Sequence, residues 1–489
     1  MTGLDTNRKR PVLVALASLL ILGFAARDLT AAEPVAATVQ EAAETSRAHL
    51  PEDTPWTFAS VLRGLMGLAT LVGIAWAISL DRRRFPWRIV LGGIGMQVVL
   101  GWMLIRARIG YGFFEAISAG ITRLLQFSNE GAVFVFGSFV TDGSKNGPGL
   151  AFTALPTIIF FSCLMAVLYH LRVMHVLIWL IAQVMNRILG VTGAESMAMG
   201  ANIFVGQTEA PLVIRRFIPR MTKSELMSLM TGGFATIAGS VLAAYIHFLR
   251  DAGGADLVPH LLIASVMSAP AAFAISKIIV PETEVSETGG GMSLRFEKSA
   301  DNVLDAAATG TVEGWKLWIN VFAMLLAFIA MVKLVDWPLE ALGDRIALEL
   351  QRAGGGLPFA VELSLARVFG FCFAPLAYLM GVEWHDASRF GALLGMKVCV
   401  NEFVAFLDLG REVALVAEGD GDAMHRRSLF MATYALCGFA NFSSIGIQIG
   451  GIAPLAPERR PEIISLALRA MIGGALASWM TASIAGMFF

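Results

Sequence analysis

Polar residues that could bind a ligand interrupt an otherwise apolar stretch, "ANIFVGQTEAPLVIRRF", from Ala201 to Phe217. Its polar members are Asn202, Gln207, Thr208 and Glu209. An amide offers a hydrogen-bond donor and an acceptor, and a carboxylate accepts hydrogen bonds from hydroxyl groups. A second stretch, "KVCVNEFVAFLDLG", places Glu402 among apolar residues in the same way. Carboxylates at membrane depth are costly and usually mark a substrate or ion pathway.

The chain around these stretches has the composition of a polytopic membrane protein. Of its 489 residues, 56% are hydrophobic and 15% are charged, and the mean hydropathy is +0.67. Such values exclude an ordinary soluble globular protein. Apolar stretches that are long enough, or nearly so, to cross a bilayer recur along the chain. They are Pro11–Ala26, Met66–Leu80, Ile89–Ile105, Ala151–Tyr169, Leu226–Leu249, Leu257–Val280, Leu317–Val335, Leu357–Met380, Ser428–Leu455 and Ile464–Phe489. We therefore expect an all-α fold embedded in membrane lipid.

The motifs of other function classes are absent from the sequence. No GxxxxGK[ST] loop is present, which argues against a pump with its own ATPase. The histidines form no HExxH pattern and the four cysteines form no CxxC pair, so we expect no zinc site. We therefore expect no enzyme activity. The net charge is −1 and no basic cluster indicates a nucleic-acid partner.

Loop charges predict the orientation of the chain. "DRRRFPWR" (Asp81–Arg88) has four Arg against one Asp, and "RRFIPRMTKSE" (Arg215–Glu225) has four basic residues against one acid. Because Lys and Arg concentrate in cytoplasmic loops, we expect both segments on the cytoplasmic side. Residues 1–53 combine a short apolar stretch with an acidic segment. We interpret them as a signal peptide or an anchor helix followed by an outer segment.

Polar interruptions also predict non-helical backbone at membrane depth. The segment Met185–Arg220 is apolar but carries Gly, Asn, Gln, Thr, Glu and Pro near its middle. Such backbone is tolerated only where it is buried in protein or lines an aqueous cavity. The segment therefore predicts a re-entrant helical hairpin that opens to the cytoplasm. The segment Lys397–Gly410 shows a similar interruption.

Each interrupted segment is followed by a similar short stretch, which indicates an internal repeat. These stretches are "FATIAGSV", starting at Phe234, and "FANFSSIGI", starting at Phe439. Aligned on the Phe, they place Thr236 opposite Asn441. Small and polar residues at these positions are expected of helices that unwind near the midplane. Paired interrupted segments in two halves point to the binding site of a secondary transporter at the repeat interface.

Three blocks of the sequence resemble the signature regions of the concentrative nucleoside transporters. They are "GANIFVGQTEAPLVIRRFIPRMTKSEL", "NEFVAF" and "CGFANFSSIGIQIGG", and the resemblance extends from about Thr54 to the C-terminus. It implies a homotrimer in the inner (plasma) membrane, each protomer having a scaffold part and a transport part. The transport part would hold two re-entrant hairpins and two unwound helices in inverted repeats.

The resemblance also implies a substrate site. Gln207, Thr208 and Glu209 would contact the nucleobase, with Val241 packed on it. The ribose site would consist of Glu402, Phe439, Asn441 and Ser444. A carboxylate suits sugar hydroxyls, and an amide suits a base edge. The sequence does not indicate which nucleosides are preferred.

The family's sodium site corresponds to the side chains of Asn202 and Thr236 and to the carbonyl groups of Val205 and Ile237. All four supply oxygen, the ligand type that a hard cation prefers. Many relatives have Ser where this chain has Thr236. Sodium is therefore the expected coupling ion, with protons as the alternative.

The sequence predicts the following division of the chain. Residues 54–180 and 312–383 would form scaffold helices, and residues 282–311, within which the polar stretch Pro281–Asn302 largely falls, a cytoplasmic loop. Residues 181–281 and 384–489 would form the two hairpin and unwound-helix repeats. We expect cation-coupled inward nucleoside transport. A nucleoside-sensing receptor or a channel with the same fold is the alternative of a different class.

Overall fold

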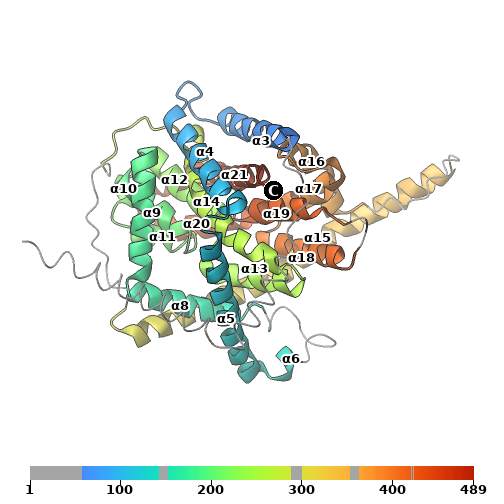
Figure 1. Cartoon of the computed structure of the whole chain (residues 1–489), viewed down its shortest axis with the longest axis horizontal. Coiled ribbons are helices and arrows are strands. Elements are labelled where there is room, and N and C mark those ends of the chain that lie inside the picture. Colours follow the sequence, from blue (N-terminus) through green and yellow to red (C-terminus); the bar gives the residue numbers. More distant parts are fainter. Residues whose placement is uncertain are drawn as a thin grey trace, which may run out of the picture.

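The structure is a computed structural model that describes residues 58–141, 152, 154–287, 300–352, 363–419, 421 and 423–489. All regular elements in these ranges are helices, as expected (Figure 1). Six helical segments of this part are long and apolar enough to cross a membrane, and up to eight if each of two bent helix pairs forms one span. The expected signal peptide or anchor lies outside the described residues.

Seven helical segments of the described N-terminal part of the chain precede the first hairpin. They are α3 (Phe58–Ala77), α4 (Trp87–Gly101), the π-helix η1 (Trp102–Arg106), α5 (Tyr111–Phe136), α6 (Ser138–Thr141), α8 (Thr157–His170) and α9 (Val173–Leu189). Helix α5 is not among the apolar stretches predicted from the sequence, because Glu115, Arg123 and Glu130 interrupt its hydrophobic residues. Helices α8 and α9 meet at a 77° bend. The predicted boundary at residue 180 falls inside α9.

The first hairpin consists of α10 (Gly193–Asn202), a non-helical tip, α11 (Ala210–Val213) and the 3₁₀ turn η2 (Ile218–Arg220). Thr192 and Glu195 form a capping box that starts α10. The next helix is broken, as the sequence predicts: α12 (Lys223–Ala235) ends at Thr236, whose backbone is extended, and α13 (Gly239–Asp251) begins after Ala238. The turn η3 (Ala255–Leu257) and helix α14 (Val258–Ile279) complete the repeat.

A buried polar network fixes the base of the first hairpin. Nζ of Lys277, on α14, lies 2.8 Å from Oε2 of Glu195, and both side chains are buried. Thr192 donates a hydrogen bond of 2.6 Å to Glu225, in the first turn of α12. The hairpin, the broken helix and α14 are therefore joined by charged and polar contacts. Such contacts favour one register among apolar surfaces that could otherwise slide.

The second repeat has the same plan. Helix α16 (Leu365–Leu379) turns by 118° into α17 (Trp384–Cys399), which begins at the predicted boundary. The second hairpin continues through the turn Val400–Asn401 into α18 (Glu402–Ala417). The broken helix follows as α19 (Arg426–Leu436) and α20 (Phe442–Ile452). The chain then passes through the turns η4 (Ala453–Leu455) and η5 (Pro457–Arg459) into α21 (Arg460–Ala485).

The two helix breaks touch each other. Gly438, in the second break, has φ +108°, and a Cβ at this position would lie 2.5 Å from the carbonyl oxygen of Phe234 at the end of α12. Only glycine adopts this conformation without strain and permits this approach. The second break, Cys437–Asn441, is longer than the first, Thr236–Ala238. Thr236 therefore begins its break, whereas Asn441 ends the other and caps α20.

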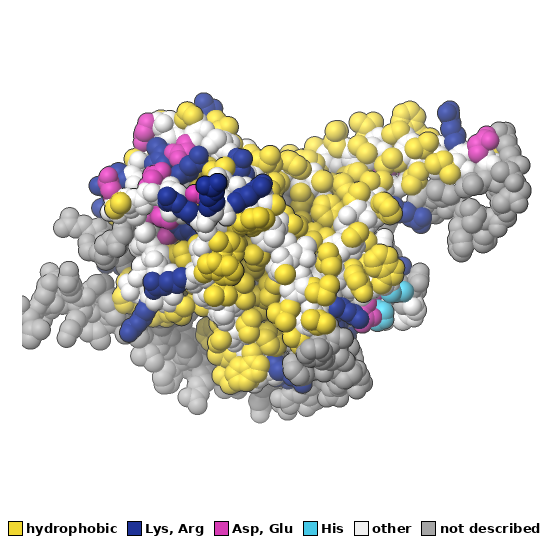
Figure 2. Space-filling model, turned by 90° about the horizontal axis from the view of Figure 1, so that it is seen from above, with side chains coloured by type: hydrophobic (Ala, Val, Ile, Leu, Met, Phe, Trp, Pro, Cys, Tyr) yellow, Lys and Arg dark blue, Asp and Glu magenta, His cyan; other side chains and the backbone are white. Residues whose placement is uncertain are grey.

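A long helix and a broad apolar surface complete the molecule. Helix α15 (Val303–Arg352) begins directly after the polar stretch Pro281–Asn302, and its far end projects beyond the rest of the described chain (Figure 1). Gly310 and Gly314 of α15 lie against the backbone of α8. Figure 2 shows an extensive hydrophobic surface, with many Lys and Arg side chains gathered at one end of the view. This distribution is typical of a protein embedded in lipid.

Candidate substrate and cation sites

A buried carboxylate joins the two repeats. Glu402 is the first residue of α18, after Asn401, whose side chain caps the helix by accepting a 2.9 Å hydrogen bond from the Val404 amide. Oε1 of Glu402 accepts a hydrogen bond from the Tyr245 hydroxyl at 3.1 Å, and Oε2 accepts one from Nδ2 of Asn441 at 2.6 Å. A carboxylate has about four acceptor positions, so two remain for a ligand's hydroxyl groups.

The helix cap at α20 orients the amide of Asn441. Its Oδ1 accepts hydrogen bonds from the Ser444 amide at 2.8 Å and from the Ser443 hydroxyl at 2.6 Å. This fixes the NH₂ group toward Glu402. Three of the residues expected at the ribose site, Glu402, Asn441 and Ser444, therefore lie together, and all three are buried. Phe439, the fourth, is buried in the adjacent break.

The amide of Gln207 lies beside the second repeat. A Cβ at Gly233 of α12 would be 2.9 Å from Cβ of Gln207 and 2.7 Å from Nε2 of Gln448 on α20. The Gln448 side chain donates a hydrogen bond of 2.8 Å to the carbonyl of Met230. Ser444 and Gln448 are four residues apart on α20, so they share one helix face. Gln207 is therefore adjacent to the helix that carries Ser444, one of the residues expected at the ribose site.

Thr208 and Glu209 take different positions at the hairpin tip. Thr208 packs against α20 and η4, because a Cβ at Gly451 would lie 2.9 Å from its Cγ2 atom. Glu209 is exposed to a cavity of about 300 Å³. The lining residues of this cavity come mainly from α8, the first hairpin, α13 and α15, with His175 of α9 and Ala238 of the first break. They include Tyr169 and Glu313 but no residue of the second repeat. Glu209 is thus not in contact with Glu402. Val241, on α13, is buried.

Two of the expected cation ligands, Asn202 and Thr236, both lie beside Gly232 at the first break. The Thr236 hydroxyl donates a hydrogen bond of 2.9 Å to the Gly232 carbonyl, and a Cβ at Gly232 would lie 3.1 Å from Nδ2 of Asn202. Asn202 is buried, and neither polar atom of its side chain has a hydrogen-bond partner in the described part of the chain. The carbonyl oxygens of Val205 and Ile237 accept none of the backbone hydrogen bonds formed by the turns and loops of the described residues.

This arrangement fits a hard cation. More than nine tenths of buried polar groups have a hydrogen-bond partner, so an orphaned amide oxygen indicates that a ligand satisfies it. The Thr236 hydroxyl uses its proton toward Gly232 and keeps its lone pairs for another partner. Two side-chain oxygens and two carbonyl oxygens with free lone pairs are the donor set that a cation such as sodium prefers.

Sequence reasoning missed three residues of this region. Tyr245 lies one turn after Val241 on α13, and this spacing on one helix face was a usable signal. Gln448 lies one turn after Ser444 on α20. Lys397 stands five residues before Glu402, where an isolated basic residue in an apolar hairpin was itself a signal. All three are fully or almost fully buried.

Known protein families and relatives that match this sequence agree with this architecture. Three family profiles cover most of the chain: "Na+ dependent nucleoside transporter N-terminus" matches residues 66–139, "Nucleoside recognition" matches 151–252, and "Na+ dependent nucleoside transporter C-terminus" matches 260–486. An uncharacterized transporter, YutK of Bacillus subtilis, is 38% identical over 431 residues, which are 88% of this chain and all of that protein.

A characterised relative and a solved structure extend the match. Sodium/nucleoside cotransporter 1 of Rattus norvegicus is 40% identical over 432 residues, which are 86% of this chain and 63% of the rat protein. The structure of CNTnw in an inward-facing substrate-bound state is similar with a TM-score of 0.76 and 37% identity, over 88% of this chain and 98% of that chain. The chain therefore belongs to the concentrative, Na⁺ dependent nucleoside transporters, a family of multi-pass plasma-membrane carriers and not of enzymes.

Proposed function

We propose that this protein is a sodium–nucleoside symporter that moves nucleosides into the cell. The base would lie against Gln207, Thr208 and Glu209, with Val241 packed on it. The ribose would bind to Glu402, Asn441 and Ser444, beside Phe439. The surroundings of Glu402 are the observation that best supports this assignment. Its carboxylate accepts hydrogen bonds from Tyr245 and Asn441 and keeps acceptor positions for sugar hydroxyls.

The orphaned amide of Asn202 supports sodium as the coupling ion. Neither Asn202 nor Thr236 is titratable, and the other two ligands would be carbonyl groups. Such a site can hold a cation but offers no position for a proton. The hairpin tip that carries Asn202 also carries Gln207, so sodium bound there would order the base-binding residues. Sodium and nucleoside would then raise each other's affinity by the same factor.

The proposed division of the chain follows the repeats. Residues 181–281 and 384–489 would form the transport part, and residues 54–180 and 312–383 the scaffold. The connecting cytoplasmic loop, predicted as residues 282–311, would be shorter, because helix α15 already begins at Val303. Most of the apolar side chains of α15 are exposed within one chain. In a homotrimer, a second protomer would give this helix a protein neighbour. A helix so apolar all round requires lipid or another protomer as its neighbour.

Uptake of labelled uridine into proteoliposomes tests this function when sodium and proton gradients are imposed separately. We expect accumulation above the equilibrium level with an inward sodium gradient, and none with a proton gradient alone. Accumulation driven only by protons would replace sodium as the coupling ion. A channel would equilibrate uridine without accumulating it, and a receptor would bind it without flux. Glu402→Gln liposomes serve as the matched control for leakage.

A further inference from the structure

Lys397 is a fully buried lysine at the end of α17 in the second hairpin. Its Nζ donates hydrogen bonds to the carbonyl of Ala435 at 2.8 Å, the carbonyl of Cys437 at 3.0 Å and Oγ of Ser478 at 2.8 Å. The two carbonyls belong to the end of α19 and to the second helix break, and Ser478 is on α21. Three oxygens, from α19, the second helix break and α21, therefore surround this nitrogen.

The contacts require the charged form of this side chain. Two of its partners are carbonyl groups, which only accept hydrogen bonds. The third partner, Ser478, uses its own proton to donate to the Ala475 carbonyl at 3.0 Å, so its oxygen also acts as an acceptor. Three acceptors need three N–H donors, and only the protonated ammonium group has three. The three oxygens therefore form the acceptor set that an ammonium group requires.

The position matches the cation site of the first repeat. There, Asn202 ends the first hairpin helix and lies near Thr236 of the first break, and Ser265 of α14 donates a 3.0 Å hydrogen bond to the Ile203 carbonyl at the hairpin tip. In the second repeat the corresponding elements are α17, the second break and α21. Both sites therefore combine the end of a hairpin helix, a helix break and the helix that follows.

We propose that Lys397 is a tethered cation that occupies the second-repeat counterpart of the sodium site. In the second repeat a covalently tethered ammonium group takes the place that exchangeable sodium takes in the first repeat. One free cation per nucleoside follows, because the second site is already filled. This inference rests on the proposed sodium site.

Chemical rescue tests the proposal. Lys397→Ala leaves three oxygens around a space that ammonium or methylammonium can enter, whereas Lys397→Met fills that space without charge. We expect uridine uptake to fall about 100-fold in both variants, and methylammonium to restore it at least tenfold in Lys397→Ala only. Potassium at the same concentration controls for ionic strength, and Glu402→Gln should show no rescue.

Two results would overturn the tethered cation: wild-type uptake by Lys397→Met, or folded Lys397→Ala that methylammonium does not rescue. If Lys397→Ala does not fold, Lys397→Met is compared with the wild type by uridine calorimetry, and equal affinity would also reject the proposal. Sodium dependence of the wild type is measured in the same liposomes. Its absence would reject the sodium site itself, whatever the lysine variants do.

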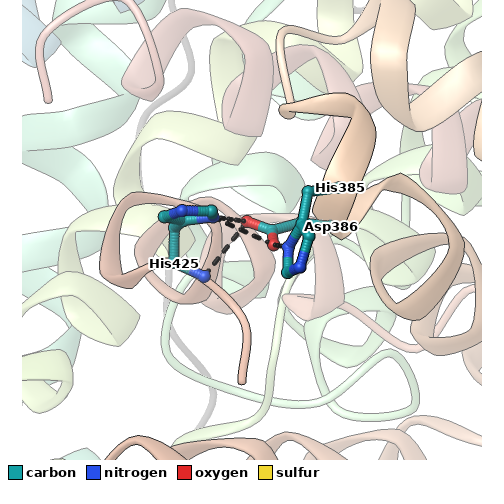
Figure 3. A group of neighbouring side chains, drawn as sticks. All are labelled: His385, Asp386 and His425. Carbon is teal, nitrogen blue, oxygen red and sulfur yellow. Dashed lines mark hydrogen bonds and ion pairs between the residues drawn. The ribbon is translucent and has the colours of Figure 1, made fainter. Parts of the chain in front are cut away.

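A different cluster carries a second inference. His385, in the first turn of α17, and His425, the N-cap of α19, both turn Nδ1 toward the carboxylate of Asp386 (Figure 3). His385 Nδ1 lies 2.8 Å and His425 Nδ1 3.1 Å from Oδ1 of Asp386. The three ligand atoms lie within 4.8 Å of one another. The imidazoles are about half exposed, whereas Asp386 is buried.

This geometry points to a transition-metal site at the junction of the second hairpin and the second broken helix. Ligands of tetrahedral Zn²⁺ bound at 2.0–2.2 Å are ~3.4 Å apart, so small side-chain shifts would admit the ion. Oε2 of Glu383 lies 3.9 Å from His425 Nδ1 and is available as a fourth ligand. The bound ion would pin the start of α17 to the start of α19.

Zn²⁺ titration of the full-length protein, purified without a polyhistidine tag, tests the metal site. We expect one Zn²⁺ per protomer by calorimetry and a rise in the melting temperature, because a ligand bound only to the folded state stabilises it. His385→Ala and His425→Ala should each weaken binding about tenfold or more, whereas His170→Ala on α8 should not. Equal Zn²⁺ affinity in the double variant His385→Ala/His425→Ala would reject the site.

Discussion

The hydroxyl of Tyr245 donates a hydrogen bond to Oε1 of Glu402 at 3.1 Å and thereby links α13 of the first repeat to α18 of the second. Asn441 of α20 binds the other carboxylate oxygen. Tyr245 of the first repeat and Asn441 of the second repeat therefore both bind the side chain of Glu402. Any movement of one repeat against the other changes the position of this carboxylate.

Glu402→Gln should nearly abolish uridine uptake while leaving expression and oligomeric state intact. A hydrogen bond to a charged group contributes ~1.5–3 kcal/mol, so its loss weakens binding by about one to two orders of magnitude. Initial uptake rates over a range of uridine concentrations measure the effect. Wild-type affinity in this variant would remove Glu402 from the site.

Tyr245→Phe should raise KM for uridine about three- to tenfold with little change in kcat. The variant keeps the ring, which packs at 4.2 Å centroid distance on Phe406, but loses the donor that orients the carboxylate. Tyr378→Phe, on helix α16, is the matched control and should behave as the wild type. Equal KM values for the two variants would contradict the positioning role.

Thr236→Ala should raise the sodium concentration needed for half-maximal uptake, whereas Thr236→Ser should change it little. Alanine lacks the hydroxyl oxygen that would bind the cation, and serine keeps it while removing only a methyl group. Sodium titrations of uridine uptake at constant ionic strength, balanced with choline, provide the measurement. If alanine and serine shifted the sodium dependence equally, the hydroxyl would not be a ligand.

Gly438→Ala should destabilise the folded protein by ~1–3 kcal/mol, the usual cost of a strained backbone position. Its φ of +108° disfavours any side chain, and the Phe234 carbonyl blocks the Cβ. Gly446→Ala on α20 is the control, because nothing lies within 4 Å of a Cβ there. Thermal melting in detergent should show a drop for the first variant only.

Lys277→Met should lower stability by ~3–5 kcal/mol, because it leaves the buried Glu195 carboxylate without its partner. The double variant Lys277→Met/Glu195→Gln should regain part of the loss, since glutamine keeps the acceptor for the helix cap without the charge. Melting temperatures of the single and double variants decide this. A double variant less stable than Lys277→Met would contradict the account.

The sequence could predict the hairpins and both helix breaks because their signals are local. Polar and small residues between Asn202 and Glu209, and after Phe234 and Phe439, stand out against an apolar background. Helix α5 was not predicted from the sequence because its charged residues lower the mean hydropathy of the segment. The bend between α8 and α9 depends on packing, and no residue pattern predicts its angle.

The expected site residues were harder to relate to one another. The alignment placed Thr236 opposite Asn441, but the breaks differ in length, so the two residues stand at opposite ends of their breaks. Contacts such as Tyr245 with Glu402 join positions 157 residues apart. Sequence spacing carries no information about such pairs without a template of the fold.

The glycine contacts between α8 and α15 define a boundary inside the molecule. Gly310 and Gly314 bring the backbone of α15 against Ser162 and Ile159 of α8, which is the close approach that a GxxxG pair permits between membrane helices. We therefore expect α8 and α15 to move together as one rigid body. The cavity at Glu209 has these two helices as one wall and the hairpin tip with α13 as the other. With one spin label on each wall, at Ser162 of α8 and Ser240 of α13, a movement of α13 relative to α8 would appear as a change in the distance between the two labels.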